Sequence, residues 1–275
     1  MISHLFFMDI DGTLCRGDSV IRQEVLDAAG AFREKGGEIV LCTGRSPMSA
    51  RRIAERLAIS LPCIVYCGAM LYDFKAGRRL ASHAMNGAVL ADIRRMLEAF
   101  PQISLMAYTA DQVYLLRSTV FFRANGVQDE IPPAVSRLED MEGQIFKIVL
   151  SCEEPLFLRQ CHEQCFGGPD YQFEFSGREF ADIVAGGVTK ADMMDRLLAL
   201  LRIPVSRTFA AGDAMTDYTM LKASGYSFAP VDADSGVLAV CDEIIPRCED
   251  NGAATALKSA LKMIGRSSHS QLPAN

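Results

Sequence analysis

The chain shows two patterns of apolar and polar positions, one in its first and last parts and another in its middle. Before residue 69 and after residue 188, short apolar runs of strand length alternate with segments in which apolar residues recur every three or four positions. The strand-like runs cover residues 5–8, 38–42, 63–66, 208–211 and 227–229, with an edge strand expected at residues 244–245. Strands that alternate with helices over short connections predict a mostly parallel sheet with helices on both faces.

Capping residues mark the helix boundaries in these two parts. Ser46-Pro47 combines an N-cap side chain with a proline in the first turn, and Thr189 can cap a helix whose apolar stripe continues to Leu201. Gly36-Gly37 is typical of a helix C-terminus. A last amphipathic helix is expected over residues 252–264.

The middle of the chain has a different order of elements. A hairpin is expected at residues 69–73 and 78–82, followed by a helix that Asn86 caps and whose apolar face carries Leu90, Ile93, Leu97 and Phe100. Further strands are expected at residues 103–108, 112–116, 145–150, 171–175 and 179–184, with a helix near 154–165. Strands and helices in this mixture predict an α+β unit rather than a continuation of the parallel sheet.

We therefore predict an α/β core interrupted by an inserted domain. The expected boundaries are 1–82 for the first part of the core, 83–185 for the inserted α+β domain, 186–265 for the second part of the core and 266–275 for a flexible tail. Gly186-Gly187 is expected to form the hinge back into the core.

Composition narrows the class of protein and its partners. The 275 residues are 49% hydrophobic and 23% charged, and 28 Lys+Arg against 34 Asp+Glu give a net charge of −6, which argues against a nucleic-acid partner. No apolar stretch is long enough to span a membrane, and the first residues lack the pattern of a signal peptide. We therefore expect a cytoplasmic protein whose nine scattered cysteines are reduced. Cys161-His162-x-x-Cys165 is interpreted as core packing rather than as a zinc site.

Polar side chains follow several of the expected strands at their carboxyl ends. Asp9 and Asp11 follow the first strand, Thr43 the second, and Asp213 the strand after the insertion, with Asp217 four residues later. In a parallel sheet these ends share one edge, where ligands bind. Lys190 begins the helix that precedes the strand before Asp213. A second acidic pair, Asp232-Ala233-Asp234, is interpreted as background because no apolar strand leads into it.

Acids, a hydroxyl and a lysine at one sheet edge fit Mg²⁺ together with a phosphoryl group. Magnesium prefers hard oxygen ligands, and lysine and threonine can hold phosphate oxygens. A carboxylate beside the metal can attack phosphorus, and a second acid two residues later can exchange a proton with the leaving group and with water. This assigns Asp9 as nucleophile and Asp11 as general acid/base.

The motifs resemble those of a known family. Asp9-x-Asp11-Gly12-Thr13-Leu14, Thr43-Gly44-Arg45, Lys190 and Gly212-Asp213-x-x-x-Asp217 are similar, in this order, to the four motifs of the haloacid dehalogenase (HAD) superfamily. An insertion of this size between the second and third motifs resembles the Cof-type, subclass IIB sugar-phosphate phosphatases. The resemblance implies a Rossmann-like core with a mobile C2-type α+β cap, and Mg²⁺-dependent hydrolysis of small phosphomonoesters.

The resemblance also implies residue roles. It implies metal ligation by Asp9, the backbone carbonyl of Asp11 and Asp213, with Asp217 orienting the metal's waters. The implied phosphate contacts are Ile10, through its backbone N–H, and Thr43, Gly44 and Lys190. Cap contacts to the substrate are expected from Arg117, Arg123 and Asp182.

Three positions depart from the family pattern. Cys67 and Thr216 stand where the family usually has asparagine, and Ala191 stands where glycine is common. The asparagine that Thr216 replaces lies near the phosphate in the family, so Thr216 is expected to contact the phosphate through its hydroxyl. We expect these changes to alter substrate preference or efficiency. The alternatives are a phosphohexomutase-like phosphoryl transferase, a catalytically degenerate protein that binds phosphorylated metabolites, and a phospho-acceptor signalling domain. Asp11 argues against the last, because an acid that activates water shortens the lifetime of an aspartyl-phosphate.

Overall fold

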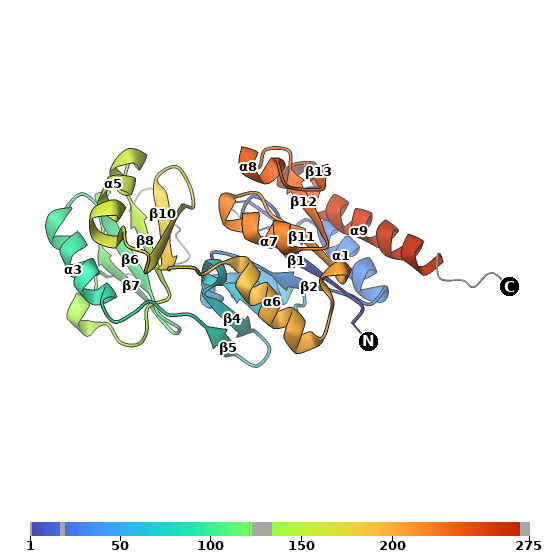
Figure 1. The fold of residues 1–275 in the computed structure, drawn as a ribbon, viewed down its shortest axis with the longest axis horizontal. Coiled ribbons are helices and arrows are strands. Elements are labelled where there is room, and N and C mark those ends of the chain that lie inside the picture. The colour runs from blue at the N-terminus through green and yellow to red at the C-terminus, as the bar shows by residue number, and fades with distance from the viewer. Residues whose placement is uncertain (1, 17–19, 121, 123–133, 270–275) are drawn as a thin grey trace. The chain divides into compact units, whose positions relative to one another are not determined.

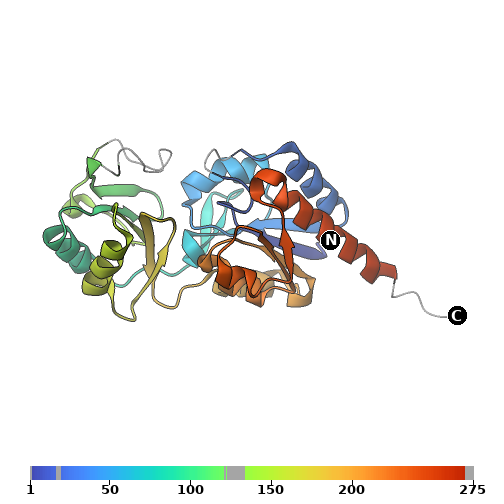
Figure 2. The same ribbon diagram turned by 90° about the horizontal axis from the view of Figure 1, so that it is seen from above.

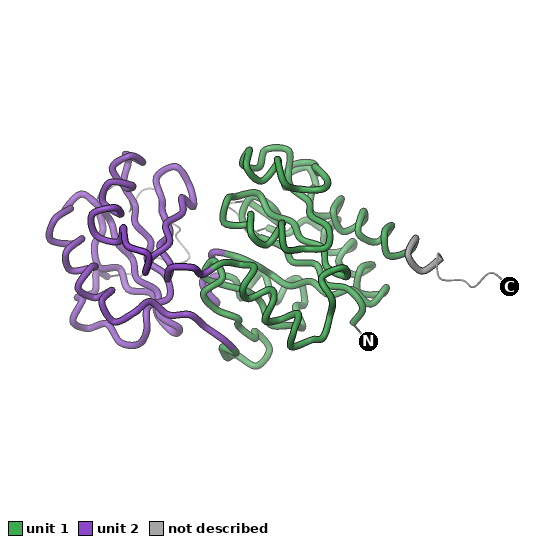
Figure 3. The backbone as a smooth tube through the Cα atoms, viewed as in Figure 1, with its two compact units in different colours: residues 1–43, 50–80, 189–275 green, residues 44–49, 81–188 purple. Residues whose placement is uncertain are grey.

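The computed structural model describes residues 2–16, 20–120, 122 and 134–269. The chain forms two compact units (Figure 3). Unit 1 comprises Met1–Thr43, Ala50–Leu80 and Thr189–Asn275, and unit 2 comprises Gly44–Ser49 and Ala81–Val188. The inserted domain expected from sequence was 83–185, and each unit is described below by itself.

Unit 1 is built around a five-stranded parallel sheet. Its strands are β1 (His4–Met8), β2 (Gly37–Leu41), β11 (Thr208–Ala211), β12 (Tyr226–Pro230) and β13 (Glu243–Ile245). Their order is β13-β12-β11-β1-β2, with all neighbours parallel. The interior strand β1, which pairs with β11 and β2, is fully buried from Leu5 to Met8 because helices cover both faces of a parallel sheet. Phe6 anchors this core and lies 5.7 Å, centroid to centroid, from Phe228.

Helices flank this sheet on its two faces. They are α1 (Gln23–Glu34), α2 (Pro47–Arg56), α6 (Lys190–Leu201), α7 (Tyr218–Ala223), α8 (Ser235–Leu238) and α9 (Gly252–His269). Helices α1 and α9 pack together on one face, and α6 and α7 pack together on the other (Figures 1 and 2). The predicted caps are confirmed: Ser46 Oγ accepts the N–H of Ser49, and Thr189 forms a capping box with Asp192.

The third predicted strand leaves the parallel sheet. β3 (Cys63–Val65) pairs antiparallel with β4 (Met70–Asp73), which continues to β5 (Arg78–Ser82) in a separate three-stranded sheet. A single parallel bridge, between Cys42 and Ile64, connects β3 to the chain after β2. The strands β4 and β5 of the hairpin predicted after residue 68 therefore form one sheet with β3, in which β4 lies in the middle.

Unit 2 contains a five-stranded antiparallel sheet with helices on one face. Its strands are β6 (Ser104–Tyr108), β7 (Val113–Arg117), β8 (Lys147–Ser151), β9 (Tyr171–Phe175) and β10 (Phe180–Ala185), in the order β7-β6-β8-β10-β9. The helices are α3 (Val89–Ala99) and α5 (Pro155–Phe166). Alternate residues of the strands form the core with them, for example Ile148 and Leu150 of β8.

Short 3₁₀ turns complete the chain. They are η1 (Tyr66–Gly68), η2 (Leu138–Asp140), η3 (Val205–Arg207), η4 (Met215–Asp217) and η5 (Cys248–Asp250). Within the described residues, no helix has the length and hydrophobicity that a bilayer crossing requires.

Two details of the first helix of unit 2 were predicted wrongly. The Asn86 side chain accepts the N–H of Ala88 in a turn, and the helix itself begins at Val89 without a side-chain cap. The buried face also differs from the expected one, since Leu90 is 46% exposed, whereas Val89 and Met96 are buried beside Ile93.

The C-terminal helix is longer than expected from sequence. Helix α9 continues to His269 instead of ending at residue 264, so the expected tail at 266–275 begins inside the helix. Extension of a formed helix costs little, and serine and arginine are tolerated within it. Residues 270–275 lie outside the described part of the chain.

Candidate active site

The sheet of unit 1 brings the predicted strand ends together. Met8 pairs in register with Leu41 of β2 and with Ala211 of β11. Asp9 therefore follows directly at the carboxyl edge, where its N–H donates to the Ala211 carbonyl at 3.0 Å. Thr43 and Asp213 follow the two neighbouring strands at the same edge. This is the edge at which open parallel sheets bind ligands.

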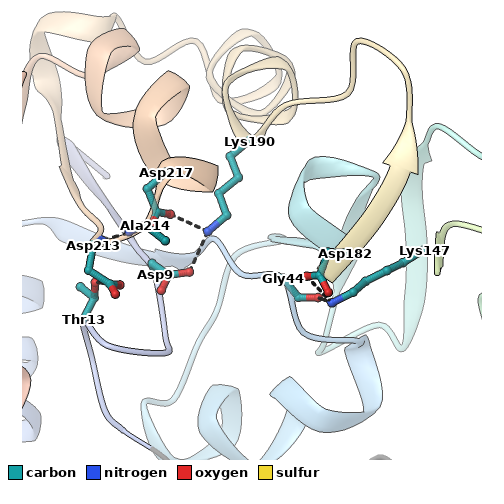
Figure 4. Close-up of polar contacts among 9 residues, drawn as sticks. All are labelled: Asp9, Thr13, Gly44, Lys147, Asp182, Lys190, Asp213, Ala214 and Asp217. Atoms are coloured by element: carbon teal, nitrogen blue, oxygen red, sulfur yellow. Dashed lines mark hydrogen bonds and ion pairs between the residues drawn. The ribbon is translucent and has the colours of Figure 1, made fainter. Parts of the chain in front are cut away.

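Lys190 lies between two carboxylates at this edge (Figure 4). Its Nζ is 2.7 Å from Asp9 Oδ1 and 2.5 Å from Asp217 Oδ1. The exposed fractions of these side chains are 1% for Lys190, 8% for Asp9 and 0% for Asp217. The capping box at Thr189 starts helix α6 at this point and so directs the lysine inward. A buried ion pair is retained only where its charges are well matched by partners.

The loop after β11 is held by Asp217. The Oδ2 atom of Asp217 accepts the N–H groups of Asp213 and Ala214, each at 3.1 Å. Asp213 Oδ1 in turn accepts the hydroxyl of Thr13 at 2.8 Å. Gly12 makes this approach possible, since its φ is +88° and a Cβ would lie 2.2 Å from Asp213 Oδ2.

The carboxylates at this site outnumber the lysine. Asp9, Asp213 and Asp217 each offer an oxygen atom within 4.8 Å of the others. Burial raises the pKa of Asp213 to about 7, and the charge of Asp217 adds to the effect. Burial likewise raises the pKa of Asp9 well above its usual range, with Asp217 adding to it and Lys190 opposing it. The excess of negative charge makes this a site suited to a cation.

Lys190 keeps its charge in this setting. Burial lowers the pKa of a lysine, but the neighbouring carboxylates Asp217 and Asp9 outweigh that effect and raise the pKa of Lys190 well above its usual value. The ammonium group is therefore a fixed positive charge beside the Asp9 carboxylate.

Three other predicted site residues, Ile10, Asp11 and Thr43, also follow strand ends at this edge of the sheet. Asp11 is exposed, and its charge contributes to the raised pKa of Asp9. The backbone carbonyl of Ile10 accepts the N–H groups of Leu14 and Cys15. Thr43 is fully buried, and its backbone N–H donates to the Ile64 carbonyl.

Gly44 and Thr216, which were also predicted to belong to the site, are sequence neighbours of Thr43 and Asp217. Gly44 directly follows Thr43 in the chain, and its carbonyl accepts the Lys147 ammonium at 2.9 Å. Thr216 is half-buried and lies in the 3₁₀ turn η4, between Met215 and Asp217.

Cys67 occupies a backbone conformation that suits asparagine better. Its φ is +55°, in the left-handed region where asparagine is favoured over other side chains with a Cβ. Gly68 follows with a φ of +102°, and a Cβ there would lie 2.3 Å from the Thr189 carbonyl oxygen. This turn therefore packs against the residue that starts helix α6, and Cys67 carries local backbone strain within it.

The expected cap contacts have other partners within unit 2. Asp182 is 5% exposed, forms an ion pair with Lys147 at 2.7 Å and accepts the Ser176 hydroxyl at 3.0 Å (Figure 4). Arg117 donates to the carbonyl of Phe100. Arg123 lies outside the described residues. A substrate contact by Asp182 or Arg117 stays a prediction.

Sequence reasoning missed two contributors. Thr13 was quoted only as part of a motif, although it bonds Asp213 directly. The pair Asp232-Ala233-Asp234 was set aside for lack of a preceding strand, and this was wrong: β12 ends at Pro230, two residues before Asp232. The predicted strand at residues 227–229 could have identified this acidic pair as one that follows a strand end.

Comparison with known proteins places this geometry in a class. The family model of haloacid dehalogenase-like hydrolases matches residues 6–257. Pyridoxal phosphate phosphatase YbhA of Escherichia coli K12 is 24% identical over 255 residues, covering 89% of this chain and 94% of that protein. 5-amino-6-(5-phospho-D-ribitylamino)uracil phosphatase YcsE of Bacillus subtilis 168 is 23% identical over 256 residues, covering 92% and 94%.

Solved structures show the same fold. A haloacid dehalogenase-like hydrolase from Bacteroides thetaiotaomicron superposes with a TM-score of 0.82 at 20% identity, covering 94% of this chain and 99% of that one. The HAD subclass IIB sugar phosphatase BT4131 gives a TM-score of 0.80 at 19% identity, covering 94% and 98%. The fold is a Rossmann-like HAD core with an inserted α+β cap, as predicted.

The protein is thus a hydrolase of the α/β class with a carboxylate-rich site at the edge of its parallel sheet. It belongs to the haloacid dehalogenase-like hydrolase family. The membership of the HAD superfamily that the sequence motifs indicated is confirmed, and the fold is shared with a solved subclass IIB sugar phosphatase.

Proposed function

We propose that this chain is a Mg²⁺-dependent phosphatase that hydrolyses small phosphomonoesters through an aspartyl-phosphate on Asp9. The observation that carries the proposal is the position of Asp9 at the end of β1, with its carboxylate 2.7 Å from the buried Lys190 ammonium. A nucleophilic carboxylate needs a nearby fixed positive charge to approach a phosphate dianion, and Lys190 supplies one.

The acidic cluster fits a divalent cation. Three carboxylate groups within 4.8 Å offer hard oxygen atoms. Burial, with the neighbouring charge of Asp217, raises the pKa of Asp213 to about 7, so a cation at this site would favour its ionised form. Asp9, Asp213 and the backbone carbonyl of Asp11 would hold the ion. Asp217, which is committed to Lys190 and to two backbone N–H groups, would orient the ligands from behind. When bound, Mg²⁺ would offset the charge on the phosphoryl oxygens.

In the first step, Asp9 forms the new bond to phosphorus. Its free carboxylate oxygen attacks, the bond from phosphorus to the leaving alcohol's oxygen breaks, and Asp11 donates its proton to that oxygen. Lys190, Thr43 and the N–H groups of Ile10 and Gly44 would hold the phosphoryl oxygens, with Thr216 nearby as a hydroxyl donor. The products of this step are the free alcohol and phosphorylated Asp9.

In the second step, water replaces Asp9 on phosphorus. Asp11, now a carboxylate, takes a proton from water as the water oxygen bonds to phosphorus and the bond to Asp9 breaks. Inorganic phosphate leaves, and both acids return to their starting protonation states. The exposed position of Asp11 gives it access to water as well as to the leaving group.

The relatives guide the choice of substrates. Two of them are named as phosphatases of pyridoxal phosphate and of 5-amino-6-(5-phospho-D-ribitylamino)uracil, and a structural neighbour is described as a sugar phosphatase. These are small metabolites with a single phosphate ester. We propose a substrate of this class. Cytoplasmic location stays a prediction.

The test is a phosphomonoester panel with and without Mg²⁺. It includes pyridoxal phosphate, the ribitylaminouracil phosphate and several sugar phosphates, and phosphate release is measured for the wild type and for Asp9→Asn. We expect metal-dependent release that falls about 10⁴-fold or more in the variant, because the nucleophile is lost. Full activity of Asp9→Asn would contradict the covalent scheme.

The same panel separates the alternatives. A phosphoryl transferase would move phosphate between positions of a sugar without releasing it, which phosphorus NMR of the products detects. A degenerate binding protein would bind the phosphates, as calorimetry shows, and release none. Either result would replace the proposed hydrolysis.

A further inference from the structure

The second acidic pair of the chain lies beside the candidate active site. Asp232-Ala233-Asp234 follows β12, and β12 pairs in parallel with β11, whose end leads to Asp213. The pair therefore occupies the same carboxyl edge of the sheet, one strand further from β1. All of these elements belong to unit 1.

Asp234 binds the Asp213 loop twice. Its backbone N–H donates to the Asp213 carbonyl at 2.8 Å, and its carboxylate Oδ2 accepts the N–H of Met215 at 3.0 Å. Asp217 accepts the two preceding N–H groups of the same loop, those of Asp213 and Ala214. Carboxylates thus hold three consecutive backbone amides of residues 213–215.

The Asp234 side chain does not serve its own helix. Asp234 is the N-cap residue of α8, a position where aspartate ordinarily accepts an N–H from the first turn of its helix. Here it makes no side-chain cap bond and binds Met215 instead. The carboxylate is therefore used to fix the neighbouring loop, at the expense of the usual cap.

Asp232 has a different set of partners. Its Oδ2 is 3.0 Å from Arg16 Nη2 and 3.8 Å from Arg247 Nε, and the Arg16 side chain is 60% exposed. Exposed ion pairs of this kind contribute little. Asp232 carries the same charge as Asp234, two residues away, but its carboxylate pairs with Arg16 and Arg247, whereas that of Asp234 binds Met215. Asp232 therefore provides a matched control.

We propose that Asp234 is a positioning residue that holds the Asp213 loop in the conformation that binds the divalent cation. The inference rests on the proposed function, since it assumes that Asp213 is a ligand. A group that orients a ligand from outside the coordination sphere typically contributes about 10- to 100-fold in metal affinity. Asp234 acts through the backbone of Met215 and Asp213 and does not touch the ion.

The experiment measures Mg²⁺ binding to the purified full chain by titration calorimetry. Asp234→Ala and Asp234→Ser remove the carboxylate that reaches Met215, and serine keeps a good N-cap for α8. Asp234→Asn removes the charge but keeps an oxygen acceptor, and Asp232→Asn removes a charge without touching the loop. Thermal unfolding without metal checks that each variant is folded.

We expect Asp234→Ala and Asp234→Ser to weaken Mg²⁺ binding by about tenfold with little change in the metal-free unfolding temperature. Asp234→Asn should recover most of the affinity, and Asp232→Asn should bind nearly as the wild type does. Wild-type affinity in Asp234→Ala and Asp234→Ser would overturn the inference. So would an Asp234→Asn as weak as the alanine variant, because charge alone would then explain the effect.

The two failures are distinguishable. A wild-type protein that binds no Mg²⁺ would remove the metal site on which the proposed function depends, and this inference with it. A wild type that binds Mg²⁺ alongside an unaffected Asp234→Ala would leave the proposed function standing and remove only the role of Asp234.

Discussion

Two buried lysines, one in each unit, show how charge balance separates a reactive site from a structural one. Lys190 in unit 1 and Lys147 in unit 2 have side chains that are 1% and 8% exposed, and each is 2.7 Å from an aspartate oxygen. Burial of this degree would be costly for either without a partner. What differs is the number of carboxylates around each ammonium group.

Lys147 is matched within the sheet of unit 2. Its ammonium group pairs with Asp182, which also accepts the Ser176 hydroxyl, and donates to the Gly44 carbonyl. Lys147 and Asp182 lie on neighbouring strands β8 and β10 and on the face of the sheet away from the helices, because the core uses the alternate positions. One charge compensates the other.

Lys190 is outnumbered. It pairs with both Asp9 and Asp217, and Asp213 lies within reach of the same cluster. Burial raises the pKa values of Asp9 and Asp213, and the charge of the neighbouring Asp217 raises them further. The comparison teaches that a buried ion pair marks a ligand site where its charges fail to cancel, and a structural element where they do.

The largest expected effect comes from removing each lysine. Lys190→Met and Lys147→Met should each lower the free energy of unfolding by about 3 kcal/mol, because each leaves a buried carboxylate without its cation. The double variant Lys147→Met/Asp182→Leu should recover most of that loss, since no charge remains unpaired. Urea unfolding measures all four free energies.

The corresponding double variant in unit 1 should not recover. Lys190→Met/Asp217→Leu leaves Asp9 without its cation and exposes the N–H groups of Asp213 and Ala214, which Asp217 satisfies. Equal recovery by the two double variants would break the proposed distinction between the sites.

Removing a carboxylate should change the stability of the protein in opposite directions in the two units. Without metal, Asp213→Asn should stabilise the protein above pH 7 by on the order of 1–2 kcal/mol, because it removes one of several repelling charges while the amide oxygen can still accept from Thr13. Asp182→Asn should destabilise, because Lys147 loses its counter-ion. Thermal unfolding of both variants in the presence of a chelator measures these changes in stability. A change in the same direction for both variants would refute the charge-balance account.

A further effect is the pH dependence that Asp213 of unit 1 should add to the stability of the metal-free protein. The pKa of Asp213 is raised from 3.8 to about 7, so the folded protein binds an extra proton between these values. The metal-free protein should therefore lose stability as the pH rises from 4 to 7 through this group. Mg²⁺ needs the deprotonated carboxylate, and its stabilising effect should grow over the same interval.

Thermal unfolding with Mg²⁺ and with chelator, at several pH values, measures this dependence. Asp213→Asn is the control, and in it both trends should be much weaker. A Mg²⁺ effect on unfolding that stays constant across the interval would contradict the raised pKa of Asp213.

Much of the fold could be predicted because the local signals agree with one another. The buried strand before Asp9, the caps at Ser46 and Thr189 and the hairpin after Gly68 each specify their own element. The predictions that were wrong concern which face of a helix is buried and which strand is the partner of another. Leu90 is exposed because Val89 and Met96 join Ile93 on the buried face of the helix, and β3 leaves the parallel sheet because it pairs with β4, which is closer in sequence.

The candidate site was predictable as a set of strand ends but not as a network. Register places Asp9, Thr43 and Asp213 at one edge, which a parallel topology requires. That Asp217 would satisfy Lys190 and the backbone of Asp213 together depends on how a short loop folds back, and sequence spacing does not specify it. The role of Asp234 was hidden for the same reason.

The central claim is that Asp9 becomes phosphorylated. It can be tested by rapid acid quench of the Asp11→Asn variant with Mg²⁺ and p-nitrophenyl phosphate, followed by mass spectrometry of the tryptic peptide that ends at Arg16. This substrate's leaving group needs no proton, whereas breakdown of the intermediate needs the base, so phosphate should accumulate on Asp9. An unmodified Asp9 in a variant that still releases p-nitrophenol, or phosphate on another residue, would contradict the account.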